Sequence, residues 1–210
     1  MATKRQKSKK TRQLKSARDY AKKQEGGADL FTLKLPEGVQ LLKLDKAGIY
    51  RLDILPYEVG QGNPNAEPGE YHFERTYFAH RVGEEGSARL YVCPAKTSGK
   101  KCPICELRIK ENNRPGADEE LVKSLLPKKR QLIPVIDRED PDKGIQIFDY
   151  SYHGFGKFLV AELDADEDGD YELFYSPSEG MTTKIRFAPS DFSAKWLVAS
   201  SINFSARKEQ

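Results

Sequence analysis

The chain has 210 residues, of which 38% are hydrophobic and 32% carry a charge. That length suits one domain with a tail or an insertion, and the modest hydrophobic fraction indicates that some segments lie outside the core. No apolar stretch approaches the roughly 18 residues of a membrane-spanning helix, and the basic N-terminus lacks the apolar region of a secretory signal. We therefore expect a cytoplasmic protein with no membrane partner.

Positive charge is concentrated at the N-terminal end. Residues 1–23 contain ten Lys or Arg and one acid, Asp19, so the remaining chain holds 25 basic and 31 acidic residues. A basic arm attached to a mildly acidic body is typical of proteins that bind an anionic polymer. We predict an arm over residues 1–27 and a folded core over residues 28–210. A solvated tail without a partner is the alternative for the arm.

Beyond the arm, alternation of apolar and polar residues predicts a series of short strands. They are expected at 30–35, 49–57, 71–82, 88–93, 130–136, 145–152, 171–175, 182–187 and 199–206. Helices are expected at 103–112, at 118–126 with Asp118 as the N-cap, and at 155–163. Because most strands lie outside residues 94–127, the sequence favours a mainly β fold with short helices. An OB-fold-like β-barrel, one of several small barrels that fit, would carry a subdomain inserted at about 80–127.

The cysteines of the chain fall inside that insertion. Cys102-Pro-Ile-Cys105 has a spacing at which two thiolates reach one ion from a tight turn. Cys93 precedes it across a polar loop that is long enough to fold back, and His80 ends the strand before that. We predict one structural zinc ion per chain, bound by His80, Cys93, Cys102 and Cys105, because one His with three Cys is a closed zinc donor set. A redox pair is the alternative for the C-x-x-C residues, and His72 is the alternative fourth ligand.

Basic and aromatic side chains alternate in several of the predicted strands. Binding of a single nucleic-acid strand needs cations along the phosphates and aromatic faces on which bases stack. In the strand at 71–82 an arginine stands between aromatic residues on one face, which is awkward for a buried core. The predicted nucleic-acid-binding residues are Arg75, Tyr77, Lys128, Lys129, Arg130, Tyr150, Tyr152 and Lys157, with Tyr71, Phe73 and Phe155 as further aromatic candidates. For each aromatic residue taken alone, an ordinary core position is the alternative.

The spacing of His80, Cys93 and Cys102-Pro-Ile-Cys105 resembles that of the single-stranded DNA-binding, helix-destabilising proteins of T-even-type phages. The similarity continues through Lys128-Lys129-Arg130, Asp140-Pro141, Gly144 and Phe155-Gly156-Lys157, and it covers roughly residues 45–206. The resemblance implies an OB-fold with a zinc subdomain and no enzymatic activity. It also implies cooperative coating of single-stranded DNA, without sequence specificity, during replication, recombination and repair.

The resemblance also bears on the arm and on partners. In that family a basic N-terminal arm contacts the neighbouring protein along the DNA, which implies such a role for Lys4, Arg5, Lys7, Lys9, Lys10 and Arg12. It implies replication and recombination proteins as further partners, and the host cell cytoplasm as the location if the protein is phage-encoded. The family's long acidic C-terminal tail, which recruits replication partners, has no counterpart before Gln210, where this sequence ends.

Two other functions fit parts of the sequence. His72-Phe73-Glu74 with Cys102 and Cys105 resembles the H-x-E and P-C-x-x-C signature of zinc-dependent nucleobase deaminases, although the proline before the first cysteine is missing. A structural RNA-binding or ribosome-associated zinc protein would also combine a basic arm with a zinc site.

An acidic run at 164–170 resembles the start of a calcium loop. Tyr175 stands at the twelfth position, where such a loop carries a carboxylate. We therefore expect a solvated acidic turn at this place.

Overall fold

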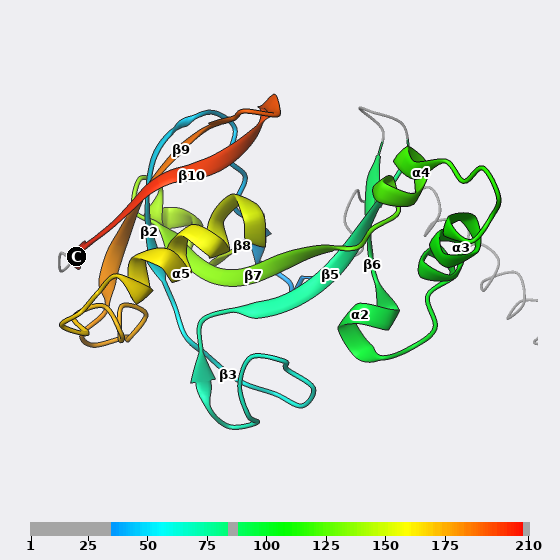
Figure 1. The fold of residues 1–210 in the computed structure, drawn as a ribbon. Coiled ribbons are helices and arrows are strands. Elements are labelled where there is room, and N and C mark those ends of the chain that lie inside the picture. The colour runs from blue at the N-terminus through cyan, green and yellow to red at the C-terminus, as the bar shows by residue number, and fades with distance from the viewer. Residues whose placement is uncertain (1–34, 84–87, 208–210) are drawn as a thin grey trace, which may run out of the picture. The chain divides into compact units, whose positions relative to one another are not determined.

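The computed structural model describes residues 35–83 and 88–207 (Figure 1). Its strands are β1 (Gln40–Leu41), β2 (Gly48–Ile54), β3 (Tyr57–Glu58), β4 (Tyr71–His72), β5 (Arg75–Val82), β6 (Arg89–Val92), β7 (Lys128–Asp137), β8 (Gln146–Ser151), β9 (Met181–Ser190) and β10 (Ser193–Ala206). Its helices are α2 (Pro94–Ser98), α3 (Pro103–Asn112), α4 (Glu119–Ser124) and α5 (Lys157–Asp164), with a 3₁₀ turn, η1 (Pro141–Lys143), and a π-helical turn, η2 (Tyr152–Gly156).

Part of what the sequence predicts lies outside the described residues. This holds for the arm with Lys4, Arg5, Lys7, Lys9, Lys10 and Arg12, and for most of the strand predicted at 30–35. The division into an arm at 1–27 and a core at 28–210 therefore stays a prediction.

β7 is the central strand of the sheet. Its first half pairs antiparallel with β5, its second half pairs with β2, and β8 runs along its opposite edge. The full order is β1-β8-β7-β2-β9-β10, with β6 attached through β5, while β3 and β4 form a separate pair. β5 and β7 are paired neighbours, and the chain between them forms β6 and the helices α2, α3 and α4; we call residues 80–127 the insertion (Figure 1).

The core lies where the strands pack on η2 and α5. Alternate residues of β2 and β7, such as Leu52 and Ile133, point inward and are fully buried. The rings of Phe148, Phe155 and Phe187 meet there with centroids 5.4–6.4 Å apart. Phe155 comes this close because its neighbour has no side chain: a Cβ on Gly156 would lie 1.9 Å from Gln131 Oε1. The sheet thus fixes the start of α5.

A mainly β fold with short helices is confirmed. Within the described residues, strand pairing follows an open path from β1 to β10, and no pairing joins the two ends into a ring. The helices α3 and α4 lie in the insertion, as predicted, and Asp118 caps α4 by accepting hydrogen bonds from two backbone N–H groups at 3.0 Å.

The strand predicted at 71–82 is wrong in its middle. β4 pairs with β3, whereas β5 pairs with β7, and the two strands are separated by Phe73 and Glu74. Phe73 packs against Phe174 with ring centroids 5.0 Å apart, and the Glu74 carboxylate accepts a hydrogen bond from the Asn65 amide at 2.9 Å. These tertiary contacts override the alternating pattern, so the predicted common face of aromatic residues is interrupted.

The strand predicted at 171–175 is also wrong, because this segment is a series of turns. The N–H of Phe174 donates to the carbonyl oxygen of Tyr171 at 3.0 Å. Aromatic residues at 171, 174 and 175 have the spacing of a helical turn rather than of a strand. Both Tyr171 and Phe174 pack on Phe204, with ring centroids 4.6 and 5.3 Å away.

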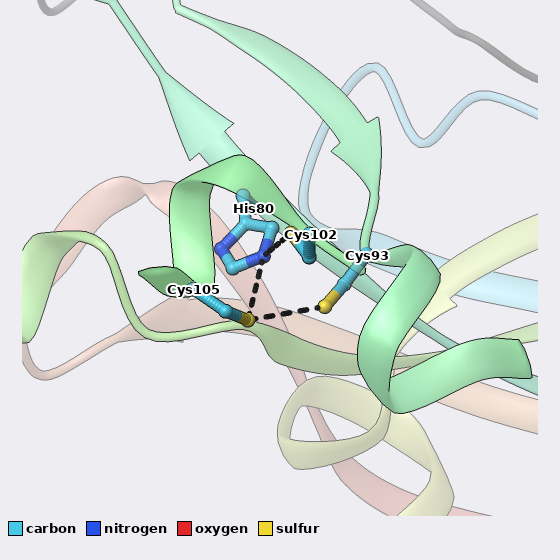
Figure 2. Close-up of side chains that lie close together, drawn as sticks. All are labelled: His80, Cys93, Cys102 and Cys105. Carbon is cyan, nitrogen blue, oxygen red and sulfur yellow. Dashed lines mark hydrogen bonds between the residues drawn. The ribbon is translucent and has the colours of Figure 1, made fainter. Parts of the chain in front are cut away.

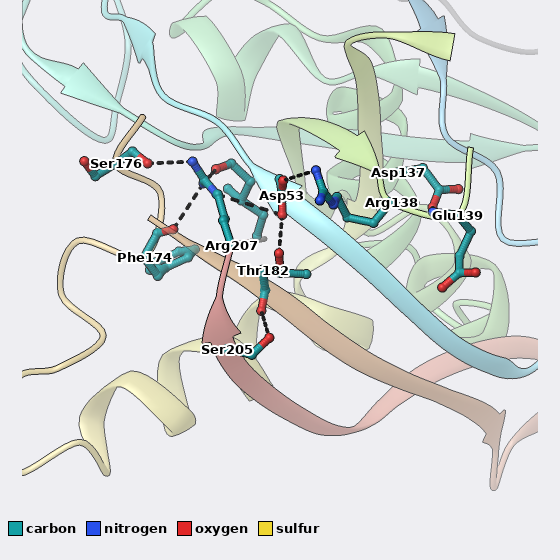
Figure 3. A network of polar contacts seen from close by, with 10 residues as sticks. Asp53, Asp137, Arg138, Glu139, Phe174, Ser176, Thr182, Ser205 and Arg207 are labelled. Carbon is teal, nitrogen blue, oxygen red and sulfur yellow. Dashed lines mark hydrogen bonds and ion pairs between the residues drawn. The ribbon is translucent and has the colours of Figure 1, made fainter. Parts of the chain in front are cut away.

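A polar network around Asp53 holds the end of β10 (Figure 3). Asp53 is buried; it accepts the Thr182 hydroxyl at 2.6 Å and pairs with Arg138 at 3.5 Å. Arg207 lies 3.9 Å from the same carboxylate and donates to the carbonyl oxygen of Ile54 at 2.9 Å. One carboxylate thus joins β2, β9 and the residue that follows β10.

Candidate metal centre and nucleic-acid interface

Four side chains meet inside the insertion (Figure 2). His80 Nε2 lies 3.3 Å from Cys102 Sγ and 3.5 Å from Cys105 Sγ, and Cys93 Sγ lies 3.5 Å from Cys105 Sγ. All four donor atoms lie within 4.8 Å of one another. A tetrahedral ion with metal–sulfur bonds of about 2.3 Å holds two sulfur ligands about 3.8 Å apart. The four atoms therefore have the separations that one bound ion requires.

Two Cys-Pro pairs start the helices that carry these cysteines. Cys93 is the N-cap of α2 and Cys102 is the N-cap of α3, each followed by proline at the first turn, where proline costs no helical hydrogen bond. Gly99 ends α2 in the left-handed region, with φ of 68°. The segment after Cys93, which was expected to be a loop, is therefore a short helix, and the Cys-Pro…Gly pattern is the signal for it.

Cys93 is held in place through β5. Its N–H donates to the carbonyl oxygen of Phe78 at 2.7 Å, and Thr97 Oγ accepts the N–H of Phe78 at 3.0 Å. Phe78 and His80 belong to the same strand, so these bonds fix the start of α2 relative to the imidazole.

The tautomer of His80 follows from its second nitrogen. His80 is fully buried, and its Nδ1 lies 2.9 Å from the carbonyl oxygen of Leu125. A carbonyl oxygen can only accept, so Nδ1 carries the proton and Nε2 directs its lone pair at the cysteines. Hydrogen bonds of this kind orient metal-binding histidines.

The three thiols lie too close together for all of them to be deprotonated without a nearby cation. Burial raises the pKa of Cys105 to about 12, and its hydrogen bonds with Cys93 and Cys102 act in the same direction. Burial also acts to raise the pKa of Cys102, but hydrogen bonds from the backbone and thiol of Cys105 lower it overall. Three thiolates, two of them buried, cannot coexist at this distance without a compensating charge, which a divalent cation would supply.

The structure thus brings together the four predicted ligands, and this group could hold one metal ion. Between residues 35 and 207, leaving aside 84–87, it is the one group of three or more His, Cys, Asp or Glu side chains with that capacity. The alternative ligand His72 belongs to β4 and packs on Phe73, with ring centroids 4.8 Å apart. The acidic run at 164–170 forms the end of α5 and turns, in which Asp166 accepts the N–H of Tyr171 at 2.6 Å.

The strand registers divide the predicted nucleic-acid-binding residues between two faces. One face of β5 and β7 carries Arg75, Tyr77, Lys128 and Arg130. Lys129 and Tyr150 project from the opposite face. The sequence placed these residues on neighbouring strands but did not separate them by face.

Tyr77 and Arg130 are held by Asp149. Arg130 Nε lies 2.9 Å from Asp149 Oδ1 and 3.1 Å from the Tyr77 hydroxyl, which itself donates to Asp149 at 2.9 Å. The side chain of Asp149 is 3% exposed and that of Arg130 is 16% exposed. Burial, and next the Asp149 carboxylate, raise the pKa of Tyr77. Their polar atoms are therefore engaged within the protein.

The other predicted residues differ in exposure. Tyr150 is half-buried and donates its hydroxyl proton to the carbonyl oxygen of Leu197 at 2.6 Å, while Phe155 is fully buried in the core. Lys129 Nζ lies 4.0 Å above the centre of the Tyr152 ring. Arg75 and Tyr152 are half-buried, and Tyr71, Lys128 and Lys157 are exposed.

A surface pocket of about 350 Å³ lies beside Lys157, and it was not predicted. It is lined by His153, Lys157, Phe158, Pro189, Ser190, Asp191, Phe192, Trp196 and Val198. Phe192 is 89% exposed and Trp196 is 37% exposed, although both are large apolar side chains. Exposed aromatic faces next to a lysine are what a nucleobase and its phosphate need. An aromatic residue between Asp191 and a serine, in a turn, is the sequence signal for this pocket.

The pocket continues towards the predicted residues. Tyr152 lies beside His153, with ring centroids 5.8 Å apart, and Lys129 lies over the same tyrosine. Lys129, Tyr152, His153 and Lys157 therefore form a series of basic and aromatic side chains that leads into the pocket.

Comparison with protein-family models gives no match for this chain, and comparison with curated proteins gives no significant match. No helix in the described part of the chain is long and apolar enough to cross a membrane. The chemistry of the chain's own side chains therefore carries the functional assignment.

Proposed function

We propose that the group of His80, Cys93, Cys102 and Cys105 binds one structural zinc ion per chain. Three thiolates and one imidazole nitrogen are donors that Zn²⁺ prefers, and four protein ligands complete its tetrahedron without an open position. The bond from His80 to Leu125 and the full burial of Cys93 support a structural ion. Such an ion would tie the end of β5 to the starts of α2 and α3.

We further propose that the protein coats single-stranded DNA cooperatively, without sequence specificity, in replication, recombination and repair. The pocket beside Lys157 carries this proposal: Trp196 offers an exposed aromatic face, and Lys157, whose Nζ lies 4.6 Å above the centre of the Phe158 ring, offers a cation for phosphate. Every base has a π-face, so stacking of this kind is tolerant of sequence. Lys129, which lies over Tyr152, would extend the cationic surface along β7, and Lys128 would add a cation on the opposite face of the strand.

The position of Glu74 supports a non-catalytic role. In the deaminase interpretation this carboxylate would transfer protons at an open coordination position of the zinc. Instead, one of its oxygens accepts from Asn65 at 2.9 Å and the other contacts the side-chain amide of Gln131. Glu74 does not belong to the group that could hold a metal ion, and that group already has four donors.

The remaining parts of the chain complete the proposal. An OB-fold-like barrel would carry the DNA on its sheet, with the insertion as its zinc subdomain. The arm at 1–27 would contact the next copy along the DNA through Lys4, Arg5, Lys7, Lys9, Lys10 and Arg12. Replication and recombination proteins would be further partners, in the cytoplasm.

Fluorescence anisotropy on labelled oligonucleotides tests this function. At matched salt, we expect the wild type to bind poly-pyrimidine and mixed-sequence single strands alike, and more tightly than duplex DNA or structured RNA. Trp196→Ala should weaken binding to every single strand by about tenfold, the value of one lost stack. Lys157→Ala should lower the slope of log affinity against log salt by about 0.7.

Two variants serve as matched controls. Tyr91→Ala removes an aromatic side chain that is 38% exposed but does not line the pocket. Lys123→Ala removes an exposed lysine that pairs with Glu119 in α4. Both should bind like the wild type. Equal affinity for duplex and single strands would contradict the proposal, and tighter binding of structured RNA would favour the RNA-binding alternative.

A further inference from the structure

Phe192 lies at the turn of the β9–β10 hairpin. It is 89% exposed, the highest value among the large apolar side chains in the described residues. The turn consists of Asp191 and Phe192, and it lies at the opposite end of the hairpin from the C-terminus (Figure 1). Phe192 lines the same pocket as Phe158 and Trp196, and exposed apolar side chains that are contiguous in this way mark a contact surface.

Hydrogen bonds close the turn that carries this ring. The hydroxyl of Ser190 donates to the carbonyl oxygen of Ser193 and accepts the N–H of the same residue, both at 3.1 Å. The register then shifts between Ser193 and Leu197, so residues 194–196 form a bulge. A bulge increases the local twist. Trp196 consequently lines the pocket together with Phe192, and Phe192 is much the more exposed of the two.

The charged side chains near Phe192 determine which part of a nucleic acid can approach it. Lys157 and His153 line the pocket, where a phosphate or a base of a bound strand would lie. Asp191, next to Phe192 in the turn, is exposed and also lines the pocket. A carboxylate repels phosphate, so a base rather than a DNA backbone would approach the tip.

We propose that Phe192 is a wedge that opens DNA at junctions between single and double strands. The inference rests on the proposed function, because the single strand of the junction must first occupy the pocket. Apolar side chains that enter between base steps unstack them. With the strand held by Trp196 and Lys157, Phe192 faces the first base pair and stacks on it as the pair opens. The protein then assists strand separation directly, instead of binding only those strands that separate spontaneously.

A tailed duplex with 2-aminopurine in the first base pair tests the wedge. The wild type, at saturation, should raise the 2-aminopurine fluorescence. Phe192→Ala should bind single strands within about twofold of the wild type but open the junction about tenfold less, since it lacks one stacking surface. Phe192→Leu keeps an apolar side chain and should retain most of the opening. Tyr91→Ala, at an exposed site outside the pocket, should behave as the wild type does. Circular dichroism should show all variants folded.

Three outcomes would overturn the wedge. Junction opening by Phe192→Ala equal to that of the wild type would leave the ring as a contact for another protein. A parallel loss of single-strand affinity and opening would make Phe192 a stacking surface for the bound strand. A wild type that fails to bind single strands would overturn the proposed function as well, and this result is distinct because it appears without any junction.

Discussion

His80 and Leu125, 45 residues apart in the chain, are joined by a hydrogen bond of 2.9 Å between Nδ1 and the backbone carbonyl oxygen. Leu125 ends α4, just before β7 begins, and His80 lies near the end of β5. The bond therefore closes the insertion at its base. Through this bond, the group of His80 and the three cysteines is connected to the start of β7, which carries Lys128 and Lys129.

Removal of the metal should loosen the insertion and spare the sheet. Without a cation the three thiols lose their common partner, while the core formed by β2, β7 and β9 contains none of the ligands. We expect Cys102→Ser, or chelation of the wild type, to speed proteolysis between 89 and 127 and to leave the far-UV spectrum of the β-sheet largely unchanged. Limited proteolysis with mass spectrometry measures this, alongside metal analysis.

Ser98→Ala is the control for this experiment, because Ser98 is exposed in α2 and contacts no ligand sulfur in the described structure. It should retain one zinc per chain and the proteolysis pattern of the wild type. A purified protein that is metal-free yet equally resistant to proteolysis in the insertion would contradict the structural role of the ion.

Replacement of Arg130 should act on stability rather than on DNA directly. Arg130→Ala leaves the buried Asp149 carboxylate without its cation, which costs about 3 kcal/mol. Tyr77→Phe removes one hydrogen bond to the same carboxylate and should cost about 1 kcal/mol. Lys128→Ala, at an exposed position, should change stability by less than about 0.5 kcal/mol but weaken DNA binding for all sequences alike.

Urea denaturation and oligonucleotide titration of the same three variants separate the two effects. If Arg130→Ala unfolds at the same urea concentration as the wild type and binds DNA more weakly, then Arg130 contacts the DNA and its pairing with Asp149 is not essential.

The sequence predicts those features that depend on local spacing. The group that could hold a metal ion follows from Cys-x-x-Cys with the preceding cysteine and histidine, and the start of α4 follows from Asp118. Strands β7 to β9 follow from alternation. Each of these depends on residues that are close in sequence and impose the same geometry in many contexts.

What the sequence did not predict depends on distant partners. From the sequence, Arg130 is indistinguishable from an unpaired cation of the basic run 128–130. Only the pairing of β7 with β8 brings the Asp149 carboxylate next to it. Trp196 reaches the pocket because a bulge shifts the register of β10, which no alternation pattern encodes. The break at Phe73 likewise comes from Phe174, 101 positions later in the chain.

The Arg207 network should contribute measurably to stability. Its guanidinium donates to carbonyl oxygens of Ser176 at 2.6 Å and Ile54 at 2.9 Å, and it packs where a Cβ on Gly180 would lie 2.6 Å from its Cζ. Arg207→Lys cannot make both bonds and should cost about 1–3 kcal/mol. Arg186→Lys, on the exposed side of β9, is the matched control. Thermal unfolding of the two variants measures this effect. Equal unfolding midpoints would contradict the contribution of Arg207 to stability.

Deletion of residues 1–23 should weaken cooperativity and flatten the salt dependence of binding. This segment holds ten basic residues and one acid, and each lost phosphate contact lowers the salt slope for single strands by about 0.7. Affinity for short oligonucleotides should persist through the pocket. Binding isotherms on long single strands measure this, and unchanged lattice cooperativity would mean that the arm is a solvated tail.

The chain contains one tryptophan, Trp196, and it lines the pocket proposed to hold the bases. Its fluorescence during titration with oligothymidylate therefore reports directly on single-strand binding at that place. We predict saturable quenching by single strands at concentrations at least about tenfold lower than those needed for duplex of the same length, since duplex bases offer no free face for stacking. Unchanged Trp196 fluorescence at full single-strand binding, or equal titration by duplex, would contradict the proposed coating of single-stranded DNA through this pocket.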